Sequence, residues 1–120
     1  MTASRRSLLG LAVLVACTSG LGSWWAARSQ QLLGERAAAL AAPGDIRMLS
    51  SETCAICTVA RRWFAEHQVA YGECFIERDA ACRAAFEATA APGTPVIVVR
   101  GQPQLGFSPR RLHAALQPRG

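Results

Sequence analysis

Two cysteines, Cys54 and Cys57, lie where a short apolar run gives way to a helical pattern. The apolar run, residues 46–49, predicts a short strand, and residues 54–66 carry apolar side chains at helical spacing. Cys54 is therefore expected at the N-terminus of a helix, where free N–H groups and the helix dipole stabilise a thiolate. Cys57 follows one turn later, within reach of a disulfide. This arrangement predicts a nucleophilic thiol and its resolving partner.

The first segment, residues 1–28, has the pattern of an export signal. Arg5 and Arg6 precede an uncharged run, residues 8–27, whose length of about 20 residues suffices to span a bilayer. Three interpretations stay open: an uncleaved signal anchor, a cleaved signal peptide, and a bacterial lipoprotein signal with Cys17 as the lipidated residue. Each places the rest of the chain outside the cytoplasm. We therefore expect a bacterial membrane protein whose folded part is on the periplasmic side.

An alanine-rich stretch, residues 29–44, separates this segment from the expected folded domain, residues 45–120. Its composition predicts a helix, which stops at the breaker pair Pro43-Gly44. Because this stretch has few large apolar side chains, we expect a stalk or linker that contributes little to a hydrophobic core.

The charge distribution argues against one class of partner. The chain has 13 basic and 8 acidic residues, a net charge of +5, and most of the excess lies before the folded domain. A nucleic-acid-binding protein needs a basic stripe within its folded part. We therefore expect no nucleic-acid partner. Separately, we expect the protein to be a monomer.

Beyond the motif, the apolar pattern predicts the element order β-α-β-α-β-β-α. The first two strands, joined by a helix, should be parallel, and the last two should form a hairpin. The first helix is expected to bury one stripe of side chains, and Asp79 is expected to cap the second helix. The expected strands are residues 45–50, 69–76, 96–99 and 103–107, and the expected buried stripe is Ile56, Val59, Ala60, Trp63, Phe64 and His67.

Two further cysteines, Cys74 and Cys82, fall on the second predicted strand and at the start of the second predicted helix. They predict a structural disulfide, a second redox pair, a regulatory thiol, or two separate buried cysteines. A disulfide would close a short loop and stabilise the domain by roughly 2–3 kcal/mol. Because a domain of this size buries a small core, we favour the structural disulfide.

The element order resembles the glutaredoxin branch of the thioredoxin superfamily. The resemblance rests on Cys-x-x-Cys at the first helix, Thr94-Pro95 before the third strand, and Gly106-Phe107-Ser108 after the fourth. It implies a thioredoxin-like α/β fold, a three-layer sandwich with a mixed four-stranded sheet. It also implies a cis bond before Pro95, with Thr94 and Pro95 contacting the substrate. Gly106, Phe107 and Ser108 would hold the γ-glutamyl carboxylate of glutathione.

The resemblance implies a thiol–disulfide oxidoreductase that acts on protein or small-molecule disulfides, in electron transport and cell redox homeostasis. Cys54 would attack as a thiolate and Cys57 would resolve the mixed disulfide. No metal or cofactor is expected, with glutathione as a candidate reductant. Two alternatives stay open: a non-catalytic binding module with a structural disulfide, and a metal-binding carrier. The sequence departs from the family at Ala55-Ile56, between the cysteines, and at Glu52, where glutaredoxins often carry a basic residue.

Overall fold

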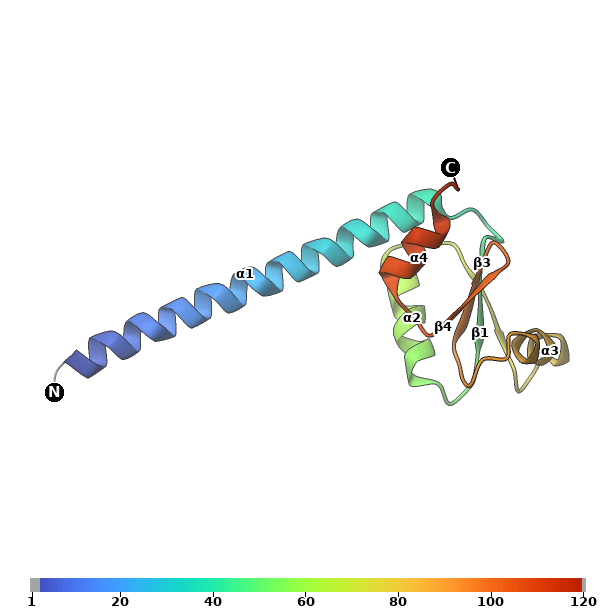
Figure 1. The fold of residues 1–120 in the computed structure, drawn as a ribbon, viewed down its shortest axis with the longest axis horizontal. Coiled ribbons are helices and arrows are strands. Elements are labelled where there is room, and N and C mark those ends of the chain that lie inside the picture. Colours follow the sequence, from blue (N-terminus) through green and yellow to red (C-terminus); the bar gives the residue numbers. More distant parts are fainter. Residues whose placement is uncertain (1–2, 120) are drawn as a thin grey trace. The chain divides into compact units, whose positions relative to one another are not determined.

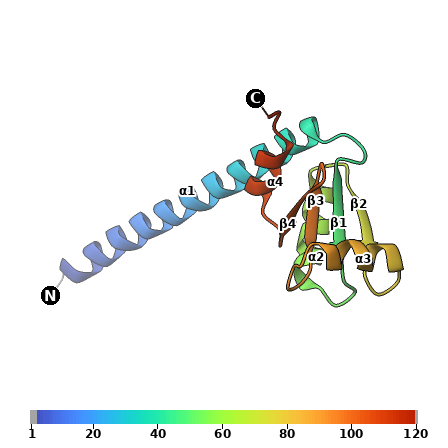
Figure 2. The same cartoon turned by 45° about the vertical axis from the view of Figure 1, so that its right-hand side comes forward.

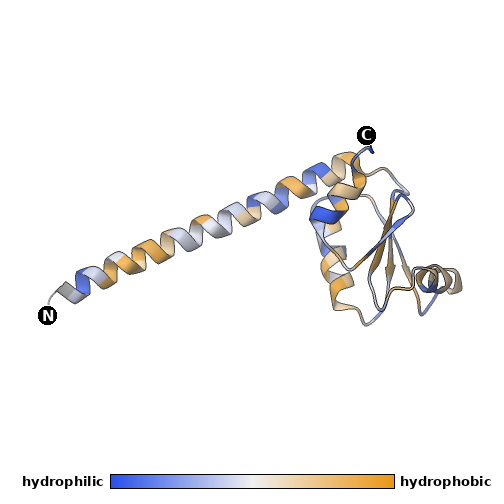
Figure 3. Cartoon of the chain, in the orientation of Figure 1, coloured by the Kyte–Doolittle hydropathy of each residue, from blue (hydrophilic) through white to orange (hydrophobic). Residues whose placement is uncertain are grey.

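The computed structural model describes residues 3–119, so residues 1–2 of the expected export segment and residue 120 of the expected domain lie outside the described residues. The chain divides into two compact units, Met1–Gln31 and Leu32–Gly120. The described part of the first unit belongs to helix α1 (Ala3–Leu40), which is long and apolar enough to cross a membrane by length and composition. Hydrophobic residues are frequent in its N-terminal half (Figure 3), and the large ones there are exposed. A signal sequence fits the same description.

The second unit is built on a mixed four-stranded sheet in the order β2-β1-β3-β4. Strand β1 (Ile46–Ser50) is parallel to β2 (Gly72–Phe75) and antiparallel to β3 (Val96–Val99). Strand β4 (Gln102–Leu105) pairs antiparallel with β3 and forms an outer edge, with Pro103 in its interior. The predicted topology is therefore confirmed.

Helices cover both faces of this sheet (Figures 1 and 2). Helices α2 (Ala55–Glu66) and α4 (Pro109–Leu116) pack on one face, and α3 (Ala80–Ala88) lies on the other. The larger core lies on the α2 and α4 side, and a smaller one lies beneath α3. Buried side chains of the larger core include Ile46, Met48, Phe64, Ile97 and Leu112; those of the smaller core are Leu49, Cys82 and Val96.

Two expectations about local structure were wrong. Strand β2 begins at Gly72 rather than at residue 69, because the Val69 N–H bonds to the Phe64 carbonyl at 3.0 Å and ends the preceding helix instead. In α2, Ile56 and Val59 are 53% and 58% exposed instead of buried. At 100° per residue, Val59 lies about 140° around the helix from the buried Phe64 and therefore faces away from the core.

The last turns of α1 contribute more to the core than the sequence predicted. Ala37 is fully buried in the larger core, and Gly34 is also buried. A Cβ atom at Gly34 would overlap the imidazole ring of His67. The expectation that residues 29–44 contribute little to the core was wrong at these positions, because small residues let a helix pack closely against large ones.

Arg100, in the β3–β4 turn, binds the C-terminal ends of α1 and α4. Its guanidinium donates to the carbonyl of Leu116 at 2.9 Å and to that of Leu40 at 3.3 Å, the last residues of α4 and α1. It also pairs with Asp45 Oδ2 at 3.1 Å. The pKa of Asp45 is lowered by the hydrogen bond from the Ala42 N–H and by that from Arg100. The helix ends therefore have partners for their free carbonyls.

Candidate active site

Strand register brings several loops to one end of the sheet. Ser50, which ends β1, is level with Phe75, which ends β2. Leu49 is opposite Val96 at the start of β3, and Val96 is opposite Leu105 at the end of β4. The loops that meet at this end carry Cys54, Glu77, Thr94, Pro95 and Gly106.

Cys54 is the N-cap residue of α2, with φ −97° and ψ 106°. Its sulfur accepts a hydrogen bond from the Cys57 N–H at 3.0 Å, and the two residues are joined by a disulfide with a Cα–Cα distance of 5.2 Å. Cys54 is half-buried, whereas Cys57 is 0% exposed. Cys54 therefore carries the more accessible sulfur. A thiolate at this position can accept hydrogen bonds from the free N–H groups at the start of the helix.

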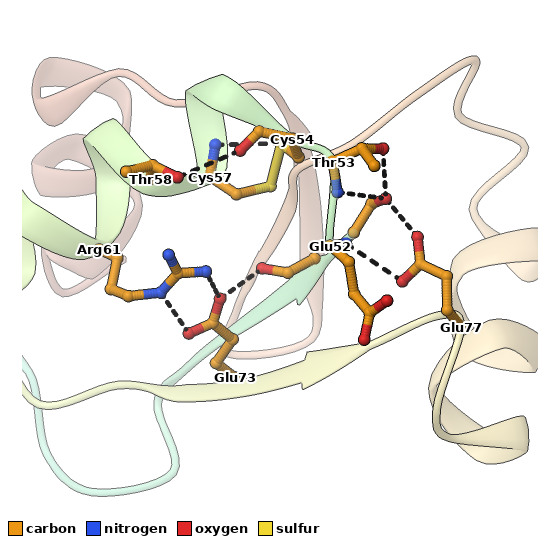
Figure 4. A network of polar contacts seen from close by, with 10 residues as sticks. Glu52, Thr53, Cys54, Cys57, Thr58, Arg61, Glu73 and Glu77 are labelled. Atoms are coloured by element: carbon orange, nitrogen blue, oxygen red, sulfur yellow. Dashed lines mark hydrogen bonds and ion pairs between the residues drawn. A yellow bond between two sulfur atoms is a disulfide. The ribbon is translucent and has the colours of Figure 1, made fainter.

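The segment before the motif is held by a carboxylate from the β2–α3 loop (Figure 4). Glu77 accepts hydrogen bonds from the Ser51 hydroxyl and, at 3.2 Å, from the Glu52 N–H. The hydrogen bond from Ser51 is the main reason that the pKa of Glu77 is lowered. The Glu52 side chain pairs with Arg78. The guanidinium of Arg78 therefore lies beside Glu52, at the position where many glutaredoxins carry a basic residue.

A second carboxylate joins α2 to the sheet one helical turn beyond Cys57 (Figure 4). Arg61 donates to both oxygens of Glu73, at 2.6 and 3.0 Å, and the buried Ser50 hydroxyl donates to Glu73 at 2.8 Å. Burial raises the pKa of Glu73, but the hydrogen bonds from Arg61 and Ser50 lower it more, so the net shift is downward. The network fixes the face of α2 that carries the motif against β1 and β2.

Replacing Glu73 by glutamine should destabilise the domain by about 1 kcal/mol at pH 7, since Arg61 loses a partly screened, bidentate ion pair. Because the folded-state pKa lies below the ordinary value of 4.5, this stability is present above that value and is lost as the pH falls through the folded-state pKa. The difference between wild type and variant should therefore shrink at pH 3. Thermal unfolding in detergent measures it, with the exposed Glu66→Gln as control. An unchanged difference at pH 3 would contradict the assignment.

The residues expected to contact the substrate lie around the start of β3 and the end of β4. The Thr94–Pro95 bond is cis, as the resemblance implies, and Pro95 is buried while Thr94 is half-buried. Gly106, with φ +75°, donates its N–H to the Pro95 carbonyl at 2.8 Å. A left-handed residue is required at that turn, which favours glycine. The structure thus brings Thr94, Pro95 and Gly106 together; their role in binding stays a prediction.

The two residues after Gly106 have identifiable structural partners. Phe107 packs edge-on against Trp63 and Phe64, with ring centroids 5.5 and 5.7 Å apart, which is a core contact. Ser108 caps α4, its hydroxyl accepting from the Arg111 N–H at 3.4 Å. Phe107 and Ser108 therefore fix the entry into α4, and glutathione binding there is untested.

The three remaining cysteines take no part in the Cys54–Cys57 disulfide. A disulfide joins Cys74 on β2 to Cys82 in α3, with a Cα–Cα distance of 6.0 Å. Cys17 is a free, exposed thiol in α1. Within residues 3–119, no group of three or more His, Cys, Asp or Glu side chains is placed to hold a metal ion.

Comparison with known proteins agrees with this geometry. Residues 46–103 match the family model of glutaredoxin. The chain carries a glutaredoxin-like domain with the thioredoxin fold. A crystal structure of a mutant of the thioredoxin-like protein BC3987 is similar at 26% identity, with a TM-score of 0.55. The match covers 61% of this chain and 95% of that one. A search of the curated proteins gave no match.

The glutaredoxin-like domain has in the Cys54–Cys57 pair the chemical group that thiol–disulfide exchange requires. A glutaredoxin domain with such a pair is, in general terms, a thiol–disulfide oxidoreductase. Sequence reasoning found the motif and the Thr94-Pro95 segment, but it missed Glu77, Arg78 and Glu73. No local pattern marks these residues, because their partners in the motif segment and in α2 lie 12 to 26 positions away along the chain.

Proposed function

We propose that this protein is a membrane-tethered thiol–disulfide oxidoreductase whose glutaredoxin-like domain works outside the cytoplasm. Cys54 is the nucleophile and Cys57 the resolving thiol. One observation carries the proposal: the more accessible sulfur of the pair is at the N-cap of α2, and its partner is fully buried one turn later. A purely structural disulfide has no need of this difference in accessibility.

The reaction consists of two exchanges in which sulfur–sulfur bonds are conserved. The Cys54 thiolate attacks a substrate disulfide, forms a mixed disulfide, and releases the first substrate sulfur as a thiolate. Cys57 then gives its proton to the released substrate thiolate, attacks the Cys54 sulfur, and releases the second substrate sulfur as a thiolate. The pair ends oxidised and the substrate reduced, and the reverse sequence oxidises a substrate dithiol. The Cys57 N–H, which donates to the Cys54 sulfur in the disulfide, is placed to stabilise the thiolate.

Protein disulfides fit the surface beside the motif better than a small anionic thiol does. Ile56 and Val59 expose apolar side chains on the first turns of α2, the helix that Cys54 caps. Two nearby arginines are already engaged, Arg61 by Glu73 and Arg111 by the Leu105 carbonyl at 2.8 Å. We therefore propose protein thiols and disulfides as substrates, with glutathione as a candidate reductant.

The membrane tether and its direction rest on the chemistry of α1. The helix has an apolar stretch with a mean hydropathy of 1.6 near the N-terminus, and Arg5 and Arg6 precede it. Positive charge before a first apolar helix favours retention of that end in the cytoplasm. The domain after the helix is then on the periplasmic side of a bacterial membrane.

Replacing Cys57 by serine tests both parts of the proposal. The variant should accumulate mixed disulfides between Cys54 and partner proteins, because nothing resolves them. These adducts should appear as reducible bands on non-reducing gels and identify the partners by mass spectrometry. In intact cells, a membrane-impermeant maleimide should label Cys54 of the same variant, after a brief impermeant reductant has released it.

The matched control is the Cys54→Ser/Cys57→Ser double variant, which should form no such adducts and should not be labelled at the motif. An absence of Cys54-dependent adducts in the single variant would overturn the two-cysteine mechanism. Labelling restricted to lysed cells would instead place the domain in the cytoplasm and leave the mechanism intact.

A further inference from the structure

The loop closed by the Cys74–Cys82 disulfide, with a sequence separation of 8, carries Glu77 and Arg78. These are the two side chains that hold the segment in front of Cys54. We propose that the Cys74–Cys82 disulfide is a second, thiol-exchangeable site that controls the reactivity of Cys54 through this loop. The inference rests on the proposed function, because it concerns the same nucleophile.

The accessible sulfur of this second pair is Cys74. It is half-buried on β2, one of the two edge strands, whereas Cys82 is 0% exposed. The guanidinium of the exposed Arg47 lies beside it, with Nη2 3.5 Å from the Cys74 sulfur. A cation at this position attracts an incoming thiolate and orients it toward Cys74.

Exchange at this site balances with a low-molecular-weight thiol as the reductant. Its thiolate attacks the Cys74 sulfur, a new disulfide forms, and the bond to Cys82 breaks with the electron pair leaving on Cys82. Protonated Cys82 remains as a thiol. A second thiolate then attacks the external sulfur of the mixed disulfide, releases Cys74 as a thiolate, and leaves as a low-molecular-weight disulfide. Two electrons have then passed from two thiols to the protein pair.

Breaking the Cys74–Cys82 disulfide affects the Cys54 thiolate by changing the charges near it. The disulfide ties both ends of the loop, β2 and the first turn of α3, so breaking it loosens the position of Arg78. Glu52, two residues before Cys54, then loses its cation, and an unpaired carboxylate disfavours a nearby thiolate. The Arg78–Glu52 pair is exposed, with 65% and 43% side-chain exposure, so the expected slowing of Cys54 is about threefold.

Glutathione redox buffers test the exchange on the Cys54→Ser/Cys57→Ser variant, which lacks the motif thiols. After rapid alkylation and digestion, mass spectrometry should find glutathione on Cys74, in an amount that changes with the buffer ratio. Arg47→Gln should slow its appearance about threefold, as expected for one exposed charge. The exposed Arg110→Gln on α4 is the control and should leave the rate unchanged. No exchange under native conditions, or glutathione on Cys82 instead, would overturn the proposal.

The coupling is measured as the alkylation rate of Cys54 across a pH series in the Cys57→Ser protein. Adding Cys74→Ala and Cys82→Ala should slow the rate about threefold below its pH midpoint. Arg78→Gln should slow it similarly, and the two changes together should not add. Cys17→Ser is the control for loss of an unrelated thiol. Should the alanine pair fail to fold, the rate is compared before and after mild reduction of Cys74–Cys82.

Equal rates with and without the second disulfide would overturn the coupling, as would fully additive effects of the disulfide loss and Arg78→Gln. The two hypotheses fail separately. Exchange at Cys74 is scored in a protein without motif cysteines, so it does not depend on oxidoreductase activity. Conversely, trapped adducts on Cys54 do not depend on exchange at Cys74.

Discussion

Replacing Cys54 by serine is expected to reduce turnover of a peptide disulfide at least about a thousandfold, since the variant has no nucleophile at the N-cap of α2. Cys57 cannot substitute, because it is fully buried behind Cys54. The measurement is the rate of reduction of a fluorogenic peptide disulfide by the purified full-length protein in detergent, with dithiothreitol as the terminal reductant. Binding of the reduced peptide should be unchanged.

The controls separate the nucleophile from the fold. Cys17→Ser removes the free, exposed thiol and should retain full turnover. The melting temperature of Cys54→Ser should lie within a few degrees of that of Cys57→Ser, because both variants lack the same disulfide. Substantial turnover in Cys54→Ser, lost only when Cys57 is also replaced, would assign the attack to Cys57 and contradict the roles proposed here.

Removing residues 1–44 should destabilise the domain by about 3 kcal/mol, whereas removing residues 1–31 should leave it close to its full stability. The shorter chain lacks Ala37, which is fully buried in the larger core, and the Leu40 carbonyl that Arg100 binds. A change of this size lowers the melting temperature of a small domain by roughly 10 °C or more. Circular dichroism of the two soluble fragments measures the difference.

A point variant tests the same contact without truncation. Gly34→Leu should also lower the melting temperature, since a side chain there meets the His67 ring. Gly22→Leu, where an added Cβ has nothing within 4 Å, is the matched control. Equal stability of the two fragments would show that the last turns of α1 are dispensable for the core.

The features that the sequence predicted are those encoded by neighbouring residues. Asp79 caps its helix, as expected, by accepting from N–H groups two and three positions ahead. Strand β3, predicted from the apolar run 96–99, and the hairpin after it are likewise encoded by neighbouring residues. Cys54 and Cys57 are close in sequence, so their position on one helical turn followed from spacing alone. These local signals were sufficient for the fold and for the centre of the site.

The features that were missed depend on packing between distant segments. Gly34 and Ala37 have small side chains, which fit an exposed helix and a closely packed one equally well, so their burial depends on what lies opposite. Ile56 has the spacing of a core residue, yet it is exposed at the first turn of α2. Glu77 lies in the β2–α3 loop, and its carboxylate accepts from the Ser51 hydroxyl and the Glu52 N–H of the β1–α2 loop, partners that are distant in sequence.

Strand β4 also affects how neighbouring copies of the domain can associate. An outer strand with free N–H and C=O groups can pair with another copy of the domain and continue the sheet. Pro103 interrupts the row of donors in the interior of this short strand, since proline has no N–H. Continuation of the sheet into another copy along this edge is thereby disfavoured.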